Sequence, residues 1–451
     1  MEFLDKLILP HSTEHLRLLI YILALALIIL LAYTGALIGT SVYSVLLNVW
    51  GRKKNDSNTL RFSRELIGLV TAKKNFALIF GILPLFTVII TYSQLMHETD
   101  LKIAGILFIS MFIYAAALIS IYFYKYTFYV DDMFKFREGN LNSDDSIVKS
   151  EKAEQMNMFI KGNLKGHKIS AASGIILLIV SAFIITTCIQ VSFDRTYWRE
   201  GTSFFKLILT YSSVIKFFYF LLASFAITSI GILFYYFSLE KDHTIENKLY
   251  AEFISKFSLY SGMILTVILP LIVIINLLAI PNNALSNTVF GINLIILVLL
   301  FLLAHYLYSM IKQSHTRYTA ASFTIFTLVF VLFVVNDQVA FDTSSQRHRV
   351  VLASEYNEMA ARLAEATQTA DANGEEIYQR LCASCHRFDQ QIVGPAYNAV
   401  LGKYEGKMDQ LTKFIQDPVK VNPDFPPMPD LGLKPAEAKA TAEYLIKTYK
   451  Q

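Results

Sequence analysis

The sequence predicts an all-α protein, in which a polytopic bundle of about eight transmembrane helices precedes a small soluble helical domain. Hydrophobic residues make up 54% of the 451 positions, and the mean hydropathy is +0.44, which is above the range of soluble globular proteins. They lie in long uncharged runs before residue 341, and several runs exceed the roughly 20 residues that cross a bilayer. Residues 342–451 have an ordinary soluble composition. We therefore expect a transmembrane bundle over residues 1–341, a linker over 342–373 and a soluble domain over 374–451.

The uncharged runs set the order of the expected membrane helices. They predict helices over residues 18–50, 75–96, 101–130, 169–191, 204–237, 257–280, 289–311 and 320–339. The charged segment 131–166 is too polar to cross. Residues 1–17 lack the short basic region and cleavage site of a signal peptide, so the first helix is expected to be retained.

Lysines and arginines beside these helices predict the orientation in a bacterial inner membrane. The loops after the first, third, fifth and seventh helices are rich in them. These loops contain Arg52, Lys53, Lys54, Arg61, Arg64, Lys135, Arg137, Lys149, Lys152, Lys161, Lys165, Lys241, Lys248, Lys312 and Arg317. The other loops carry few. The basic loops are therefore expected in the cytoplasm, with the N-terminus and the C-terminal domain on the periplasmic side.

The linker is expected to contain one short helix. Ser354 can cap a helix over residues 355–367, whose Ala, Leu and Glu favour helix formation. A spacer between the membrane and the soluble domain is the plainer interpretation, and a helix that docks a partner is the alternative.

A C-x-x-C-H motif in the soluble domain carries the main chemical prediction. Cys382, Cys385 and His386 form this motif, whose spacing is typical of covalent c-type haem attachment. Both thiols can add to the vinyl groups of one porphyrin, and the histidine can then bind the iron. A zinc half-site would need two more ligands, and a thiol redox pair would not need the histidine. We therefore expect one covalent haem c.

Two methionines are candidates for the second iron ligand. Met428 lies between prolines in an extended loop, where its sulfur is free to approach a haem. Met408 comes at the start of a predicted helix and is expected to pack in the core. We favour Met428, because prolines keep its loop out of a helix. Ligation by histidine and methionine raises the reduction potential and suits a carrier of single electrons.

Residues 374–451 resemble a class I cytochrome c. The resemblance rests on the helix that begins at Gly374 and leads into the motif, on Gly394-Pro395, and on the Met428 loop. It implies that Met428 is the second ligand and that the carbonyl of Pro395 accepts a hydrogen bond from the ring of His386. It also implies that the first and last helices of the domain cross. Gly374 and Tyr378 would then lie against Tyr444.

The membrane body resembles, more weakly, subunit I of the cytochrome bd-type oxidases over its first 240 or so residues. The similar stretches are residues 62–66, 76–94 and 216–224. Tyr219 stands where a haem-ligating histidine of that family would fall, and the first helix has no histidine across residues 25–31. The quinol-binding loop is also missing. The resemblance therefore implies a body that has lost its b haems.

A few polar residues interrupt the membrane helices. His305 alone among the histidines lies well inside one, and it is either a ligand or a hydrogen-bonded residue of the bundle. Lys216 is expected to extend its side chain to the outer boundary, and Asp337 to be solvated near the outer end of the last helix. Cys188 is expected to be a small buried apolar residue. Asn276 is the main polar residue that would favour a transporter.

Charge argues against nucleic acid as a partner. The net charge is +4, mostly from membrane loops, and the soluble domain has ten acidic and ten basic side chains.

The sequence therefore predicts a membrane-anchored monohaem cytochrome c that transfers single electrons at the periplasmic face. Its partners would be other redox subunits of a respiratory or photosynthetic complex, a soluble periplasmic cytochrome, and the lipid bilayer. Two alternatives stay open. One is a bd-like oxidase or quinol dehydrogenase subunit with a buried haem or quinone site near His305. The other is a transporter or redox sensor with a haem tail.

Overall fold

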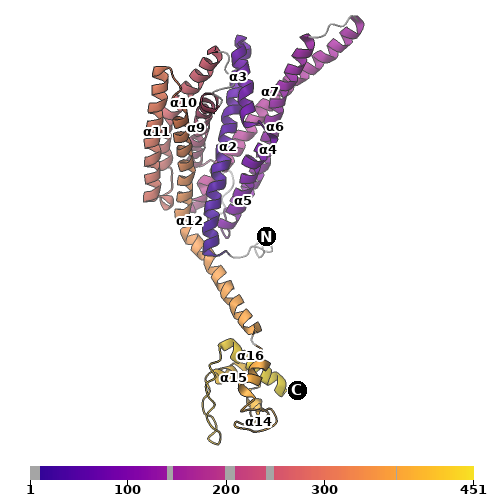
Figure 1. The fold of residues 1–451 in the computed structure, drawn as a ribbon, viewed down its shortest axis with the longest axis vertical. Coiled ribbons are helices and arrows are strands. Elements are labelled where there is room, and N and C mark those ends of the chain that lie inside the picture. The colour runs from indigo at the N-terminus through magenta and orange to yellow at the C-terminus, as the bar shows by residue number, and fades with distance from the viewer. Residues whose placement is uncertain (1–10, 140–145, 199–208, 240–247, 372, 451) are drawn as a thin grey trace. The chain divides into compact units, whose positions relative to one another are not determined.

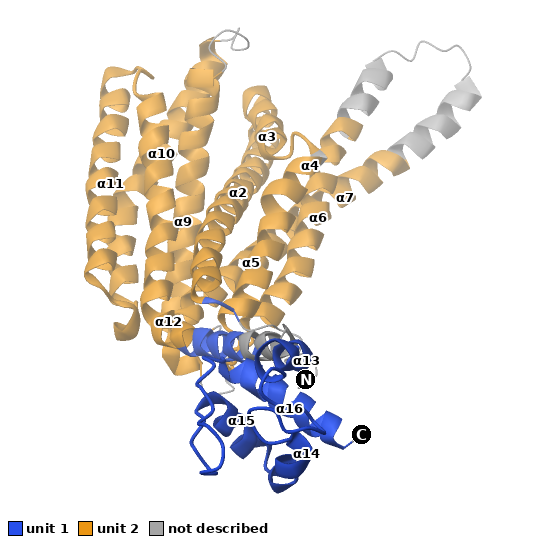
Figure 2. Ribbon diagram, turned by 60° about the horizontal axis from the view of Figure 1, so that its bottom comes forward, with its two compact units in different colours: residues 1–12, 351–451 blue, residues 13–350 orange. Residues whose placement is uncertain are grey.

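The computed structural model describes residues 11–139, 146–198, 209–239, 248–371 and 373–450. The chain forms two compact units, residues 13–350 and residues 1–12 with 351–451 (Figure 2). The described residues are helical and contain no strand, only an isolated bridge between His386 and Gln391. The all-α prediction is confirmed.

Eight helices in the described part of the chain are long and apolar enough to cross a membrane, as the sequence predicts. The helices are α2 (Thr13–Lys54), α4 (Lys74–Ala77) continued by the π-turn η1 (Leu78–Ile82) and α5 (Leu83–Leu95), α6 (Ile103–Gly139), α7 (Ser146–Ser192), α9 (Tyr211–Phe234) continued by η3 (Tyr235–Leu239), α10 (Lys248–Leu278), α11 (Asn287–Gln313) and α12 (Thr319–Asp371). Short turns η2 (Arg195–Tyr197) and η4 (Asn282–Ala284) lie between them. The first residues expected for the fifth helix, 204–208, lie outside the described residues.

Helix α2 is central, because it contacts α3 (Ser57–Val70), α5, α7 and α9 (Figure 1). Two glycines permit its close approach to α9. A Cβ at Gly39 would lie 2.1 Å from Oγ1 of Thr228, and one at Gly35 would lie 3.0 Å from Oγ of Ser224. Small residues at a helix crossing are the usual means of packing helices inside a membrane.

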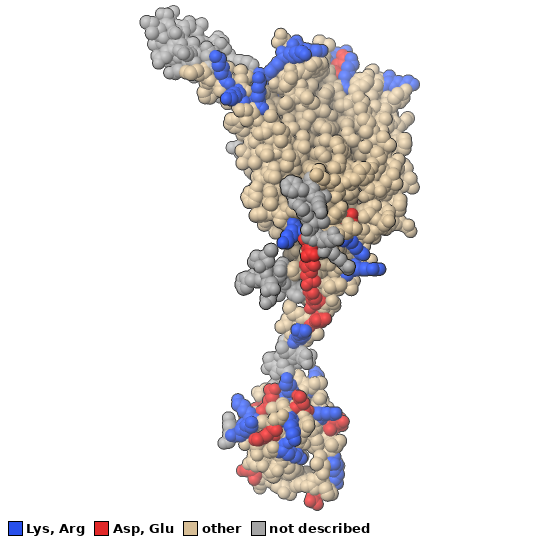
Figure 3. Space-filling model, turned by 180° about the vertical axis from the view of Figure 1, so that it is seen from behind, with Lys and Arg blue, Asp and Glu red and all other residues tan. Residues whose placement is uncertain are grey.

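The surface of this unit suits a lipid environment. On the face shown in Figure 3, charged side chains gather at its two ends and leave a broad uncharged belt between them. Large apolar side chains such as Leu25, Ile119, Ile176 and Phe301 are exposed on its helices. Exposed apolar area on this scale marks contact with a membrane, and the protein is therefore a membrane protein.

One helix was not predicted. Residues 57–70, treated above as part of a loop, form the amphipathic helix α3 (Ser57–Val70). Asp56 caps it by accepting a hydrogen bond from the Asn58 amide at 3.0 Å. Glu65 ties the helix to the bundle, because it accepts hydrogen bonds from the hydroxyls of Tyr236 at 2.6 Å and Tyr250 at 2.7 Å.

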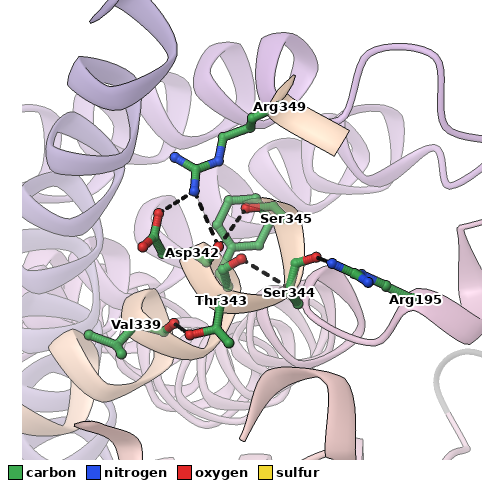
Figure 4. Close-up of polar contacts among 8 residues, drawn as sticks. Arg195, Val339, Asp342, Thr343, Ser344, Ser345 and Arg349 are labelled. Atoms are coloured by element: carbon green, nitrogen blue, oxygen red, sulfur yellow. Dashed lines mark hydrogen bonds and ion pairs between the residues drawn. The ribbon is translucent and has the colours of Figure 1, made fainter. Parts of the chain in front are cut away.

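The prediction of a separate linker helix was wrong. Helix α12 continues without interruption to Asp371, because residues 340–371 contain neither glycine nor proline. Ser354 therefore lies inside a helix, where its hydroxyl donates to the carbonyl of Val351 at 2.7 Å. Arg195 contacts α12 on the C-terminal side of the helix's most apolar part. Its Nε donates a hydrogen bond to the Ser344 carbonyl at 2.6 Å (Figure 4).

The structure bears on the expectations for four residues in the membrane helices. Lys216 does not extend to the boundary and Asp337 is not solvated, because their side chains are 1% and 2% exposed and pair with each other. Position along a helix is visible in the sequence, but the face that points inward is not. His305 is exposed on the outside of α11, so it does not line the bundle interior. Cys188 is buried, as predicted.

The small domain contains α13 (Gly374–Ile377), the π-turn η5 (Tyr378–Cys382), α14 (Tyr397–Val400), η6 (Leu401–Tyr404), α15 (Met408–Gln416) and α16 (Pro435–Tyr449). Its first and last helices cross as the resemblance implies. A Cβ at Gly374 would lie 2.1 Å from the Ala440 carbonyl oxygen, and the rings of Tyr378 and Tyr444 are 5.5 Å apart.

Candidate haem-binding site

A cavity of about 480 Å³ in the small domain brings the predicted site residues together. Cys382, Cys385, His386, Pro395 and Met428 all line it, although they come from three separate parts of the domain. The size is in the range of small-molecule and cofactor sites. Most of the remaining lining is apolar, from residues such as Leu381, Val400, Leu401, Leu411, Phe414, Ile415, Leu431 and Leu445.

A short helix and a tight turn position the motif. Asn373 caps the helix by accepting a hydrogen bond from the Glu375 amide at 3.1 Å. The helix ends as the π-turn η5 at Cys382, whose carbonyl accepts from the amides of Cys385 at 3.1 Å and His386 at 2.9 Å. This turn folds the motif back on itself, so both sulfurs and the imidazole face the same cavity.

A hydrogen bond fixes the orientation of the His386 ring. Its Nδ1 lies 3.0 Å from the carbonyl oxygen of Pro395. Because a carbonyl can only accept, Nδ1 carries the proton and Nε2 is left with a free lone pair for a metal. Gly394 permits this approach, since a Cβ there would lie 2.1 Å from Cε1 of His386.

Tyr397 is a site residue that the sequence analysis missed. Its ring stacks on the ring of His386, with centroids 5.0 Å apart and an interplanar angle of 13°. Burial raises the pKa of Tyr397 well above its usual range, so the hydroxyl stays protonated beside Cys382. An aromatic residue two positions after Pro395 was the only signal in the sequence.

The state of Cys382 argues against the other interpretations of the motif. Burial raises the pKa of its thiol above the usual range. A redox pair uses a thiolate, which an electropositive and partly exposed setting stabilises. The described residues also contain no cluster of three His, Cys, Asp or Glu that would hold a metal ion by side chains alone.

The two methionines separate as expected. Met428 lines the cavity from a loop in which Pro426, Pro427 and Pro429 surround it. Met408 begins α15 and packs against the domain core instead. The cavity thus offers two sulfhydryls, one imidazole nitrogen and one thioether around apolar walls, which is the donor set and environment that haem c requires.

Comparisons with known proteins agree with this geometry. The family model of subunit III of the cbb3-type cytochrome c oxidases matches residues 369–445. A cytochrome c-551 of Pseudomonas denitrificans is 35% identical over 79 residues, which are 17% of this chain and 96% of that protein. A cytochrome c-551 of Azotobacter vinelandii is 36% identical over 77 residues, which are 16% of this chain and 94% of that protein.

Fold and site together define a membrane protein with a C-terminal electron-transfer domain that carries covalent haem c. Through that domain the chain belongs to the cytochrome c family. The matches do not extend to the membrane body, where the similarity to bd-type oxidases stays an interpretation of the sequence.

Proposed function

We propose that this protein is a membrane-anchored monohaem cytochrome c that transfers single electrons on the periplasmic face of a bacterial inner membrane. It would act as a subunit of a larger respiratory or photosynthetic complex. The observation that carries the proposal is the convergence of Cys382, Cys385, His386 and Met428 on one apolar cavity. When bound there, haem supplies an iron that cycles between its ferrous and ferric forms.

Each of these residues has a defined task in the proposal. Cys382 and Cys385 would hold the porphyrin by two thioether bonds, and Nε2 of His386 would bind the iron. The Pro395 carbonyl orients that ring through its hydrogen bond to Nδ1. Met428, which lines the same cavity from its own loop, would supply the second ligand to the iron. This pair of ligands favours a high reduction potential and a low-spin iron, which suits rapid transfer of one electron.

The periplasmic location rests on charge. Basic side chains are abundant in the loops after α2, α6, η3 and α11, and scarce in the loops on the other side. Helix α12 leaves the membrane on the side whose loops have fewer basic side chains, so the small domain follows on the periplasmic side. A protease-accessible tag placed after Gln451 should be cleaved in intact spheroplasts. Cleavage only after lysis would contradict this orientation.

The membrane body would be a scaffold that holds redox partners, as expected for a bd-like body without b haems. Tyr219 in place of a ligating histidine supports this assignment. The alternative of a buried haem or quinone site near His305 loses support, because that side chain is exposed on α11. A transporter would need several ion ligands at the membrane midplane, and Asn276 on α10 offers a single amide oxygen.

A potentiometric titration of the purified full-length protein tests the electron-transfer function. The proposal predicts that a single one-electron transition accounts for all the haem absorbance. Two transitions, or a carbon monoxide complex that forms readily with the reduced protein, would contradict a single six-coordinate haem.

A further inference from the structure

The membrane bundle contains a buried ion pair that the electron-transfer function does not use. Lys216 of α9 donates to the carboxylate of Asp337 of α12, and their side chains are 1% and 2% exposed. Two charges inside a membrane bundle are expensive to bury, and they mark a functional site more often than a structural one. Replacing such a pair by apolar residues of similar size is often neutral, so stability alone does not account for it.

Polar side chains beside the pair lack partners. The hydroxyl of Tyr219, which lies near Asp337, has no hydrogen-bond partner among the residues that the structure describes. The side-chain amide of Gln338 makes no well-formed hydrogen bond either, although it lies near the hydroxyl of Tyr92. Tyr219 is 3% exposed and Gln338 is 4% exposed. Buried polar groups are nearly always paired, with protein atoms or with ordered water. These groups are therefore built to hydrogen-bond a small polar guest.

The remaining neighbours restrict what that guest can be. The rings of Phe333 and Phe193 lie 4.9 and 5.9 Å from Nζ of Lys216. From α5, the hydroxyl of Tyr92 faces Asp337 and Gln338 and lies 3.3 Å from Oγ of Ser192. The thiol of Cys188 also lies close to Tyr92.

The charges of the pair oppose any ionic guest. The ammonium of Lys216 repels a metal cation from the carboxylate, and the carboxylate of Asp337 repels an anion from the ammonium. Water is neutral and both donates and accepts hydrogen bonds, so it can bind beside both charges of the pair. Water is also the carrier that brings protons to a buried carboxylate.

We propose that Lys216 and Asp337 form a proton-loading site, supplied through water molecules held by Tyr219 and Gln338. In the resting state the carboxylate and the ammonium neutralise each other. A proton from bulk water then forms an O–H bond on Asp337, the salt bridge opens, and the pair gains one positive charge. No electron is transferred in this step. The pair lies near one end of its helix, because Lys216 is only about 8 Å along the axis from the start of α9 at Tyr211.

Infrared spectroscopy of the full-length, haem-loaded protein in lipid bilayers tests the proposal. As the pH falls, a carboxylic acid C=O band should appear and should shift in D₂O. The band should be missing from Asp337→Asn and present in the control Asp342→Asn, which removes an exposed carboxylate from the same helix. If the wild-type protein lacks this band, or if the band does not exchange in D₂O, the ion pair is closed to water and only structural, and the proposal is wrong.

Two further variants separate a relay from a packing role. Tyr219→Phe keeps the ring contact with Phe333, whose centroid is 4.3 Å away, and removes only the hydroxyl. Its exchange in D₂O should be slower by about tenfold or more, since one relay group is lost. Exchange at the wild-type rate would show that Tyr219 takes no part in proton transfer to Asp337. The double variant Lys216→Leu with Asp337→Leu should fold with full haem content and lack the band. Failure of this variant to fold would show that the pair is structural and would overturn the proposal.

Discussion

Replacing Gly394 by alanine tests how the chain holds the ring of His386. The added Cβ would lie 2.1 Å from Cε1 and 2.7 Å from both ring nitrogens. Contacts of this kind shorter than 3.0 Å do not persist, so the ring has to move by about 1 Å. A shift of that size away from residues 394–395 stretches the 3.0 Å hydrogen bond between Nδ1 and the Pro395 carbonyl beyond the usual limit of about 3.2 Å.

The lost hydrogen bond should be visible in the reduction potential. The bond makes the imidazole a stronger donor and so stabilises the ferric iron, and its loss raises the potential. A net hydrogen-bond free energy of about 1 kcal/mol corresponds to about 40 mV for one electron, so we expect a rise of about 20–40 mV.

Potentiometric titration of the full-length variant measures this shift. Gly402→Ala is the matched control, because its Cβ would meet only Oη of Tyr449, at 3.0 Å, at the tip of a flexible side chain. The control should keep the wild-type potential. A Gly394→Ala protein with full haem content and an unchanged potential would refute the packing of His386 described above.

The remaining predictions concern the ligand, the helix crossing and the stacked tyrosine. Met428→Ala should give a high-spin or weakly ligated haem in the optical spectrum, whereas Met408→Ala, which removes a core side chain, should keep the low-spin spectrum. The reverse pattern would make Met408 the iron ligand and would contradict the assignment of Met428. Gly374→Ala should lower the free energy of unfolding of the domain by about 1–3 kcal/mol in denaturant titrations, because its Cβ would meet the Ala440 carbonyl at 2.1 Å. An unchanged midpoint would contradict the crossing. Tyr397→Phe keeps the stacked ring and should leave the haem content unchanged, whereas Tyr397→Ala should reduce it.

Features that depend on local sequence were predictable. The eight apolar helices follow from length and hydropathy, and the C-x-x-C-H spacing points to haem c without knowledge of the fold. Met428 was separable from Met408 because prolines keep it out of a helix. The crossing of the first and last helices of the domain was implied by the resemblance to class I cytochromes c.

Features that depend on the rotation and packing of whole helices were not predictable. Lys216 and Asp337 are 121 positions apart, and only the packing of α9 against α12 shows that they pair. The sequence places His305 well inside a membrane helix, yet the rotation of α11 puts it on the outside. Tyr397 is assigned to the site only when its ring is seen against His386.

The pyridine haemochrome spectrum of the purified full-length protein tests the central claim most directly. The claim is that the haem held by Cys382 and Cys385 is the only haem, and that the membrane body carries none. The account predicts one haem c per chain, which stays with the polypeptide in acidified acetone, and no haem b. A stoichiometric amount of extractable haem b would contradict it and would make the membrane bundle a redox centre in its own right.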